Sequence, residues 1–263
     1  MCKFRKKVKE QERYSGEDAF LMDIFNNHKT ETFGFQGTGK DLLTSHVIRL
    51  IGRPYYANIE YDGNVTLFDL KDLNAGGNTY QDLINGTVKK FPRKFAEGWH
   101  KYISDCGIYL PSQYYKDLEE IYPGMPVEFA LHRQLYNSQI HINSQDIDRP
   151  WTKLTEQIDA FINTLGVRRE GEYLYVRYVY YTKYDSARKG ILPLPRTEGI
   201  DGERDAAQFY ATFGTISEHE IRVHIRDVEY DTRYFKNVFF LDEEELKKYK
   251  PVRINKYDNY KRH

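Results

Sequence analysis

Short apolar runs alternate with amphipathic segments from about residue 30 to residue 168. A strand-like run from Thr30 to Phe35 leads into a glycine-rich turn. A helix is then expected over residues 41–51, because its apolar residues share one stripe: Leu43, Val47, Leu50 and Ile51. Further strands are expected at 55–61, 99–105 and 139–143, and further helices at 112–122 and around 127–136. Strands and helices that alternate in this way predict a mostly parallel sheet covered by helices.

The best-patterned helix is expected next along the chain. It opens at Asp148-Arg-Pro150, and its apolar residues recur three or four positions apart: Trp151, Leu154, Ile158, Phe161 and Leu165. This spacing predicts one long helix that buries a single face.

After residue 168 the pattern becomes that of strands. Residues 173–182 are nearly all β-branched or aromatic, and residues 220–226 alternate strictly between apolar and polar. The segments 190–195 and 199–202 are expected to be loops. The sequence therefore predicts a smaller, Tyr-rich β region at 169–241, followed by a charged tail at 242–263. A basic N-terminal extension, expected to be solvated, occupies residues 1–29.

Composition excludes several classes of protein. The 39 Lys and Arg residues balance the 39 Asp and Glu residues, which argues against coating nucleic acid through bulk charge. The 23 Tyr, 15 Phe and 2 Trp residues supply enough apolar surface for a core, so wholesale disorder is excluded. The longest apolar runs, such as residues 237–241, fall far short of the ~20 residues that span a bilayer. No membrane-spanning helix is expected.

The cysteines and histidines give no sign of a disulfide framework or a structural metal. Cys2 and Cys106 are too few for such a framework, so the chain is expected to be cytosolic and reduced. The basic N-terminus has no apolar segment behind it and is not a secretory signal. His219 and His224 are five positions apart on a strand-like segment, which puts them on opposite faces.

The strongest chemical signal is the run Gly34-Phe-Gln-Gly-Thr-Gly-Lys40, which lies between the first strand and the first helix. This is the P-loop arrangement: the glycines let backbone N–H groups point at phosphates, the helix N-terminus adds partial positive charge, and the lysine reaches the β- and γ-phosphates. A glycine-rich turn that only caps a helix is the alternative. The P-loop interpretation predicts that ATP and Mg²⁺ bind at Gly34, Gly37, Thr38, Gly39, Lys40, Asp41 and Leu42.

Two positions depart from the usual motif. Asp41 stands where a Ser or Thr hydroxyl normally holds Mg²⁺; a carboxylate can also bind Mg²⁺ but adds negative charge beside the phosphates, and Thr44 is a further hydroxyl candidate. A second acid is expected at the end of another strand, and Asp105 supplies it, with a turn-capping Asp as the alternative. Cys106 follows where a catalytic Glu is common. Nucleotide binding is therefore predicted, and hydrolysis is left open.

Several segments, in the correct order, resemble the Zot-type ATPases, the assembly proteins of filamentous phages named after the zonula occludens toxin. They are residues 34–43, 54–61, 102–112, 131–134 and 140–145, within a resemblance that covers about 31–165. It implies that residues 30–168 form an α/β P-loop NTPase domain of RecA/FtsK-like type, with the smaller β-rich region C-terminal to it. It further implies a ring-forming homo-oligomer that uses ATP to drive phage assembly and export of single-stranded DNA through the host inner membrane.

The resemblance also implies roles for individual residues. Lys40 would be the phosphate lysine, Asp105 the Walker B acid, and Gln145 the sensor that reads the γ-phosphate or orients water, with an ordinary strand-end amide as the alternative for Gln145. Arg133 and Arg149 are candidate arginine fingers that act on a neighbouring subunit's nucleotide, with a solvated surface residue as the alternative for each.

The chain departs from this family in lacking a transmembrane helix after the ATPase domain. We therefore expect it in the host cytoplasm, held at the inner membrane only through a phage or membrane protein partner. Tyr175 and Arg177 are candidate contacts to single-stranded DNA, because exposed rings on one strand face can stack on bases. Ordinary packing within a sheet is the alternative.

Two other functions fit parts of the sequence. Cys106 in place of a catalytic Glu would suit a non-hydrolysing scaffold that assembles with nucleotide. The Gly-Lys-Asp order also occurs in some phage nucleotide kinases, although the arginines available for phosphate contacts form no lid-like motif: Arg168, Arg169 and Arg188.

Overall fold

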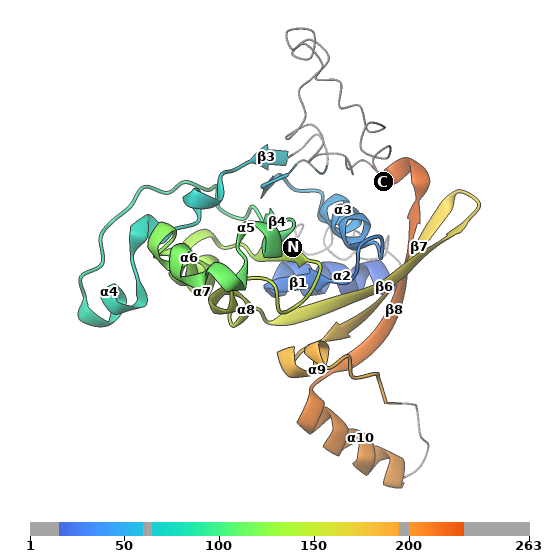
Figure 1. Ribbon diagram of the computed structural model, residues 1–263. Coiled ribbons are helices and arrows are strands. Elements are labelled where there is room, and N and C mark those ends of the chain that lie inside the picture. The colour runs from blue at the N-terminus through green and yellow to red at the C-terminus, as the bar shows by residue number, and fades with distance from the viewer. Residues whose placement is uncertain (1–15, 60, 62–64, 195–199, 229–263) are drawn as a thin grey trace, which may run out of the picture. The chain divides into compact units, whose positions relative to one another are not determined.

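The computed structural model describes residues 16–59, 61, 65–194 and 200–228. In that part of the chain, eight strands form one sheet in the order β3-β2-β4-β5-β1-β6-β7-β8 (Figure 1). The strands from β3 to β6 pair in parallel, while β7 and β8 add antiparallel. Their bounds are β1 (Thr30–Phe33), β2 (Tyr55–Ala57), β3 (Val65–Leu67), β4 (Lys101–Ile103), β5 (Ile140–Ser144), β6 (Ala160–Glu170), β7 (Tyr173–Tyr181) and β8 (Ile216–His224).

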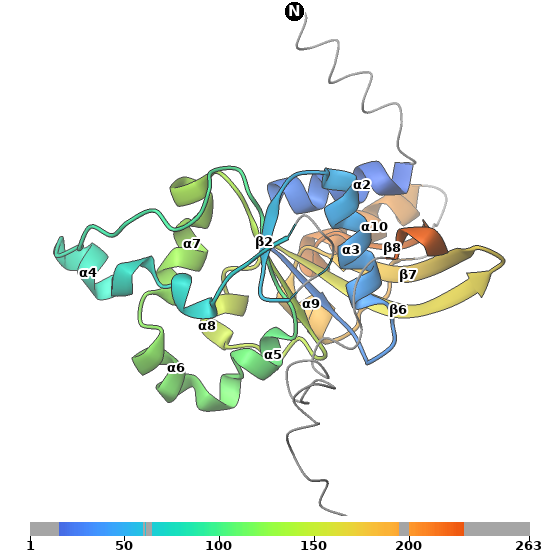
Figure 2. The ribbon, with the colours of Figure 1, turned by 90° about the horizontal axis from the view of Figure 1, so that it is seen from above.

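Helices cover both faces of the sheet, as the two sides of Figure 2 show. On one face lie α2 (Gly16–Asn27) and α3 (Lys40–Ile51); the ring of Phe25 in α2 packs 4.7 Å from that of His141 in β5. The other face packs on α5 (Cys106–Tyr109), α6 (Tyr115–Ile121), α7 (Met125–Tyr136) and α8 (Thr152–Thr155). Every residue of β1 and β5 is buried, as expected for central strands of a parallel sheet.

Shorter elements complete the described chain. They are α4 (Tyr80–Asn85), α9 (Tyr184–Arg188), α10 (Ile200–Phe213), and the 3₁₀ turns η1 (Leu70–Asp72), η2 (Ala75–Gly77), η3 (Ser112–Tyr114) and η4 (Ile225–Asp227). Among the described residues, every helix is too short or too polar to cross a bilayer.

The strand order brings the predicted chemistry to one edge. β1 carries the glycine-rich loop at its end, β5 lies beside it, and β4 lies beside β5. Because these strands are parallel, the segments that follow them meet at the same edge of the sheet. The predicted α/β class is confirmed: a mostly parallel sheet covered by helices, to which the β-rich C-terminal region adds two antiparallel strands.

The long helix expected from residue 148 to residue 165 is wrong. The chain forms only the short α8 there and then enters β6, which pairs in parallel with β1 from Ala160↔Thr30 to Asn163↔Phe33. Trp151, Leu154, Ile158 and Phe161 are buried as the pattern required. Pairing with the central strand overrides the helical spacing because β1 is buried and its backbone groups on this side would otherwise lack partners.

The limits of the predicted segments also differ. Residues 16–27 of the expected N-terminal extension form α2, which buries Leu21, Ile24 and Phe25. Residues 200–202, expected to be loop, begin α10. The expected boundary at 168 falls inside β6, so the β-rich region continues the same sheet. Residues 1–15 and the tail at 242–263 lie outside the described residues.

One part of the sheet extends beyond the rest. β6 pairs with β1 only as far as Asn163 and then continues to Glu170, with β7 and β8 running alongside. We call residues 164–178 the arm; in Figure 1 it is the yellow hairpin that reaches past the end of β1. The arm begins beside the glycine-rich loop.

Candidate nucleotide-binding site

The glycine-rich loop has the backbone conformation that its sequence predicts. Gly34, Gly37 and Gly39 have φ values of 145°, 82° and 98°, a range that disfavours any side chain. A Cβ on Gly34 would lie 2.6 Å from the carbonyl oxygen of Thr164, and one on Gly39 would lie 2.6 Å from Cγ2 of Val167. The loop is therefore a cradle of bare backbone pressed against β6, and α3 begins directly after it.

Lys40 lies at the mouth of this cradle. Its Nζ donates to the carbonyl oxygens of Gly34, at 2.8 Å, and Phe35, at 3.1 Å, and the side chain is 8% exposed. Burial lowers the pKa of Lys40, while Asp41 and Asp105 raise it. The ammonium thus folds back over the loop that it follows, which is the position from which it can contact phosphates.

Asp41 is the centre of a polar cluster. Its Oδ1 accepts from the Tyr61 hydroxyl at 3.4 Å, the Ser104 hydroxyl at 3.4 Å and Asn143 Nδ2 at 3.3 Å. Thr44 does not face an open site: it is buried and shares hydrogen bonds with Asn143. These contacts join α3 to β5 and to the segments that follow β2 and β4, and they orient the Asp41 carboxylate.

Asp105 follows β4, in the left-handed region with φ 48°. Burial raises the pKa of its carboxyl, the nearby charge of Asp41 raises it further, and Lys40 lowers it. Two carboxylates and one lysine therefore share the same neighbourhood. Cys106 is fully buried in the hydrophobic core, so its side chain is not exposed beside the loop.

Gln145 and Arg149 lie beside Asp105. Arg149 Nη1 donates to Gln145 Oε1 at 3.3 Å, and both residues line a small hollow together with Asp105, Gly107 and Ile108. Gly107 permits this arrangement, since a Cβ there would lie 2.7 Å from Cβ of Arg149. The predicted acid, the predicted sensor and one predicted arginine are thus brought together.

The other predicted residues lie elsewhere. Arg133 is exposed on the last turns of α7, near the edge where β5 begins rather than where it ends. Tyr175 and Arg177 are on the arm. The guanidinium of Arg168 lies 4.0 Å from the centre of the Tyr175 ring, and Arg177 forms an ion pair with Glu218. Both candidate DNA contacts are therefore already engaged by neighbouring side chains.

Four residues of the site were not predicted. Tyr61, Ser104 and Asn143 bind Asp41, and Thr164 shares a 2.7 Å hydrogen bond with Thr38. Ser104 directly precedes the predicted acid and Asn143 lies two positions before the predicted sensor, so strand-end polar residues were a usable signal. Tyr61, the last residue of the strand expected at 55–61, carried the same signal, whereas for Thr164 the sequence offered none.

The residues present fit a nucleotide with Mg²⁺. The glycines of the loop carry no side chains, so their backbone N–H groups can approach phosphates closely. Lys40 supplies a cation beside them. Mg²⁺ is commonly held by one or two carboxylates together with substrate phosphates, and Asp41 and Asp105 offer those carboxylates. Over the described ranges, no three His, Cys, Asp or Glu side chains group as a metal site independent of nucleotide.

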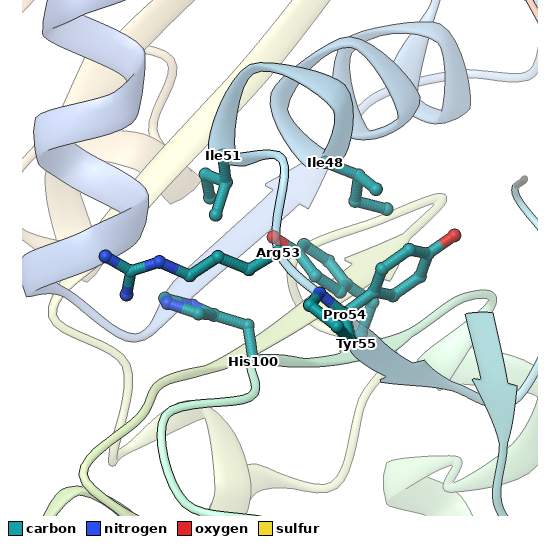
Figure 3. A pocket seen from close by; sticks show the side chains of 7 residues that line it. Ile48, Ile51, Arg53, Pro54, Tyr55 and His100 are labelled. Carbon is teal, nitrogen blue, oxygen red and sulfur yellow. The ribbon is translucent and has the colours of Figure 1, made fainter. Parts of the chain in front are cut away.

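A separate hollow lies at the opposite end of α3 (Figure 3). It is lined by residues from the helix end, its connection to β2, and the start of β4: Ile48, Ile51, Arg53, Pro54, Tyr55, His100 and Tyr102. Burial lowers the pKa of His100 to about 4, with Arg53 and Lys101 adding to the effect, so this imidazole is neutral at pH 7. The hollow is apart from the glycine-rich loop and contributes nothing to the site.

No family model and no curated protein sequence matches this chain. Among solved structures it is similar to the N-terminal domain of zonular occludens toxin from Neisseria meningitidis, at 10% identity and a TM-score of 0.35, covering 79% of this chain and 97% of that one.

It is also similar to the AMP complex of the genome packaging NTPase from Sulfolobus turreted icosahedral virus 2, at 11% identity and a TM-score of 0.38, covering 76% of this chain and 94% of that one. A KaiC-like protein from Pyrococcus horikoshii OT3 follows at 10% identity and a TM-score of 0.32, covering 61% and 81%.

Proposed function

We propose that this protein is a P-loop ATPase that powers phage morphogenesis. One observation carries the enzymatic part: Lys40 folds over a glycine cradle at the end of β1, with Asp41 and Asp105 close enough to shift its pKa. A cation at the mouth of a backbone anion site, flanked by two carboxylates, suits a nucleoside triphosphate with Mg²⁺.

The residues of the site would have separate roles, set by where each one lies. The loop N–H groups and Lys40 would hold the β- and γ-phosphates and balance their charge. Asp41, oriented by Tyr61 and Asn143, and Asp105 would hold Mg²⁺, which when bound neutralises charge that develops on the phosphates. Gln145 would orient the attacking water, and its Oε1 is fixed by Arg149 at 3.3 Å. Arg149 would thereby act in its own site, whereas Arg133 could reach only a neighbour's nucleotide.

The motor part of the proposal rests on the ordered segments that resemble the Zot-type ATPases. The chain would assemble into a ring in the host cytoplasm, link to the inner membrane through a phage or membrane partner, and drive export of single-stranded DNA. Tyr175 and Arg177 would contact that DNA only after exchanging their present partners, Arg168 and Glu218.

Nucleotide titration and turnover test this function. We expect Mg²⁺-dependent ATP binding, weakened roughly 10- to 100-fold in Lys40→Ala, because charged hydrogen bonds to phosphate are lost. Lys116→Ala, which removes an exposed lysine on α6, is the matched control and should bind like the unaltered chain. We also expect phosphate release that single-stranded DNA accelerates. Equal ATP affinity in Lys40→Ala and the unaltered chain would overturn the proposal.

A second function is favoured by one observation. Cys106 stands where a catalytic Glu is common, and its side chain is buried in the core. The two acids beside the loop, Asp41 and Asp105, are the ones proposed to hold Mg²⁺. A non-hydrolysing scaffold that assembles with nucleotide is therefore the second candidate function. Light scattering during the same titration separates the two. Assembly with ATP but without phosphate release identifies the scaffold, and sustained turnover excludes it.

A further inference from the structure

The glycine-rich loop has two unlike flanks. Toward β5 and β4 lie the carboxylates of Asp41 and Asp105 and the amide of Gln145. Toward β6 lies the base of the arm, where the loop contacts aliphatic side chains. A bound nucleotide also has two unlike ends, a charged phosphate end and an aromatic base.

The arm is in direct contact with the loop. A Cβ on Gly39 would lie 2.6 Å from Cγ2 of Val167 and 3.1 Å from Cγ1 of Val176, and the Thr38 and Thr164 hydroxyls share a 2.7 Å hydrogen bond. Val176 is fully buried, whereas Val167 keeps 38% of its surface exposed. An apolar surface therefore begins at the mouth of the cradle and remains open.

Further out on the same face of the arm lies Arg169. Val167 pairs with Val176 and Arg169 pairs with Leu174 across the hairpin, so these four side chains share one face. The exposed guanidinium of Arg169 donates from Nε to the carbonyl oxygen of Gly171. Residues two apart on a strand are separated by about 6.6 Å, so Arg169 lies one side-chain position beyond Val167.

We propose that this face of the arm, formed by Val167 and Arg169, is the nucleobase subsite of the bound nucleotide. The proposal rests on the nucleotide-binding function above. The terminal phosphate belongs on the flank where Asp41 and Asp105 can share Mg²⁺ with it. The base must then extend to the opposite flank, where the isopropyl group of Val167 contacts one ring face and the Arg169 guanidinium stacks on the base.

The opposite face of the arm provides a matched control. Arg168 precedes Arg169 on the same strand but points away from the loop, where it lies over the Tyr175 ring and forms an ion pair with Glu220. Arg168→Ala and Arg169→Ala therefore remove the same charge from adjacent positions, and only one of them removes a group from the proposed subsite.

The test compares ATP with inorganic tripolyphosphate, which offers phosphates but no base. Binding of each with Mg²⁺ is measured for the unaltered chain, Arg169→Ala, Arg168→Ala and Val167→Thr. We expect Arg169→Ala to weaken ATP binding roughly three- to tenfold and leave tripolyphosphate binding unchanged. Val167→Thr, which keeps the shape but replaces one methyl group with a hydroxyl, should also weaken ATP binding alone. Arg168→Ala should change neither.

Each contrary result has a distinct meaning. Unchanged ATP affinity in Arg169→Ala and Val167→Thr overturns the subsite while leaving the proposed function intact. Equal weakening of ATP and tripolyphosphate also overturns it, because the arm would then act on the phosphates or on folding. An ATP defect of the same size in Arg168→Ala assigns the effect to overall charge and overturns the subsite too. Failure of the unaltered chain to bind either ligand overturns the proposed function, and the subsite with it.

Discussion

Glu31 is a carboxyl group buried in the middle of the strand that leads into the glycine-rich loop. Its Oε1 accepts a 2.7 Å hydrogen bond from the Ser144 hydroxyl, while its Oε2 has no partner among the described residues. Burial raises the pKa of Glu31 to about 8; the Ser144 hydrogen bond lowers it, and Asp146 and Asp148 raise it further. The group is therefore protonated at pH 7 and faces the core as a neutral acid.

This carboxyl should make stability depend on pH. Its folded pKa, about 8, lies above the ordinary value of 4.5, so the folded state holds the proton over that range and the unfolded state does not. The free energy of unfolding should fall by about 1.4 kcal/mol per pH unit between those two values. Glu31→Gln, a neutral isostere, should remove this slope, so that the variant matches the unaltered chain near pH 5 and exceeds it at pH 9.

Chemical denaturation of both chains at several pH values measures the difference. Other titrating groups contribute equally to the two curves, so only their separation reports on Glu31. Curves that run parallel from pH 5 to pH 9 would show that Glu31 does not hold the proton.

Among the elements, the glycine-rich loop and the arm are in close contact at Gly39. Gly37 and Gly39 both have positive φ, but a Cβ on Gly37 would meet nothing within 4 Å, whereas one on Gly39 would collide with Val167. Gly37→Ala should therefore cost only the left-handed strain of about 1–2 kcal/mol in unfolding free energy. Gly39→Ala should cost that strain plus about 1–3 kcal/mol for the collision.

A double substitution separates the two terms. Val167→Ala in the Gly39→Ala background removes the colliding methyl groups, so it should recover part of the lost stability, and in the Gly37→Ala background it should recover none. Equal losses in both single variants would mean that the arm yields freely and is not held against the loop.

Much of the structure within residues 30–168 could be predicted because local signals and tertiary structure agree there. The loop, α3 and the strand-end position of Asp105 follow from glycine spacing, amphipathic pattern and the order of apolar runs. The segment 160–165 could not be predicted, because Phe161 and Leu165 continue a helical spacing while the decisive influence is pairing with β1, more than a hundred positions away. Propensity and spacing cannot report a partner so distant.

The polar cluster around Asp41 shows the same limit at the site. Asp41 and Asp105 were identified from positions fixed by a motif, whereas Tyr61 and Asn143 reach Asp41 from two other segments. Such contacts depend on strand order, which the sequence does not state. Likewise, Arg133 and Arg149 were equivalent candidates by sequence, and only the direction of β5 puts Arg149 beside Gln145 and Arg133 near the other edge.

At the scale of the whole molecule, the different positions of Arg133 and Arg149 predict which of them can act only on the nucleotide of a neighbouring subunit. We expect Lys40→Ala and Arg149→Ala each to lose ATP turnover, and a mixture of the two to stay inactive, because Arg149 serves the site of its own chain. Arg133 lies away from its own loop, so any role in turnover must be exerted on a neighbour. A mixture of Lys40→Ala with Arg133→Ala should then recover about a quarter of full activity, the share of sites that pair an intact loop with an intact arginine.

Turnover of the mixtures, with co-assembly checked by light scattering, decides between the two arrangements. Recovery with Arg149→Ala would move that residue from its own site to the neighbour's. Full activity of Arg133→Ala on its own would make Arg133 a surface residue. Because a shared site is the one arrangement in which two inactive chains can restore each other, recovery in either mixture would also establish that the active unit is an assembly of at least two subunits.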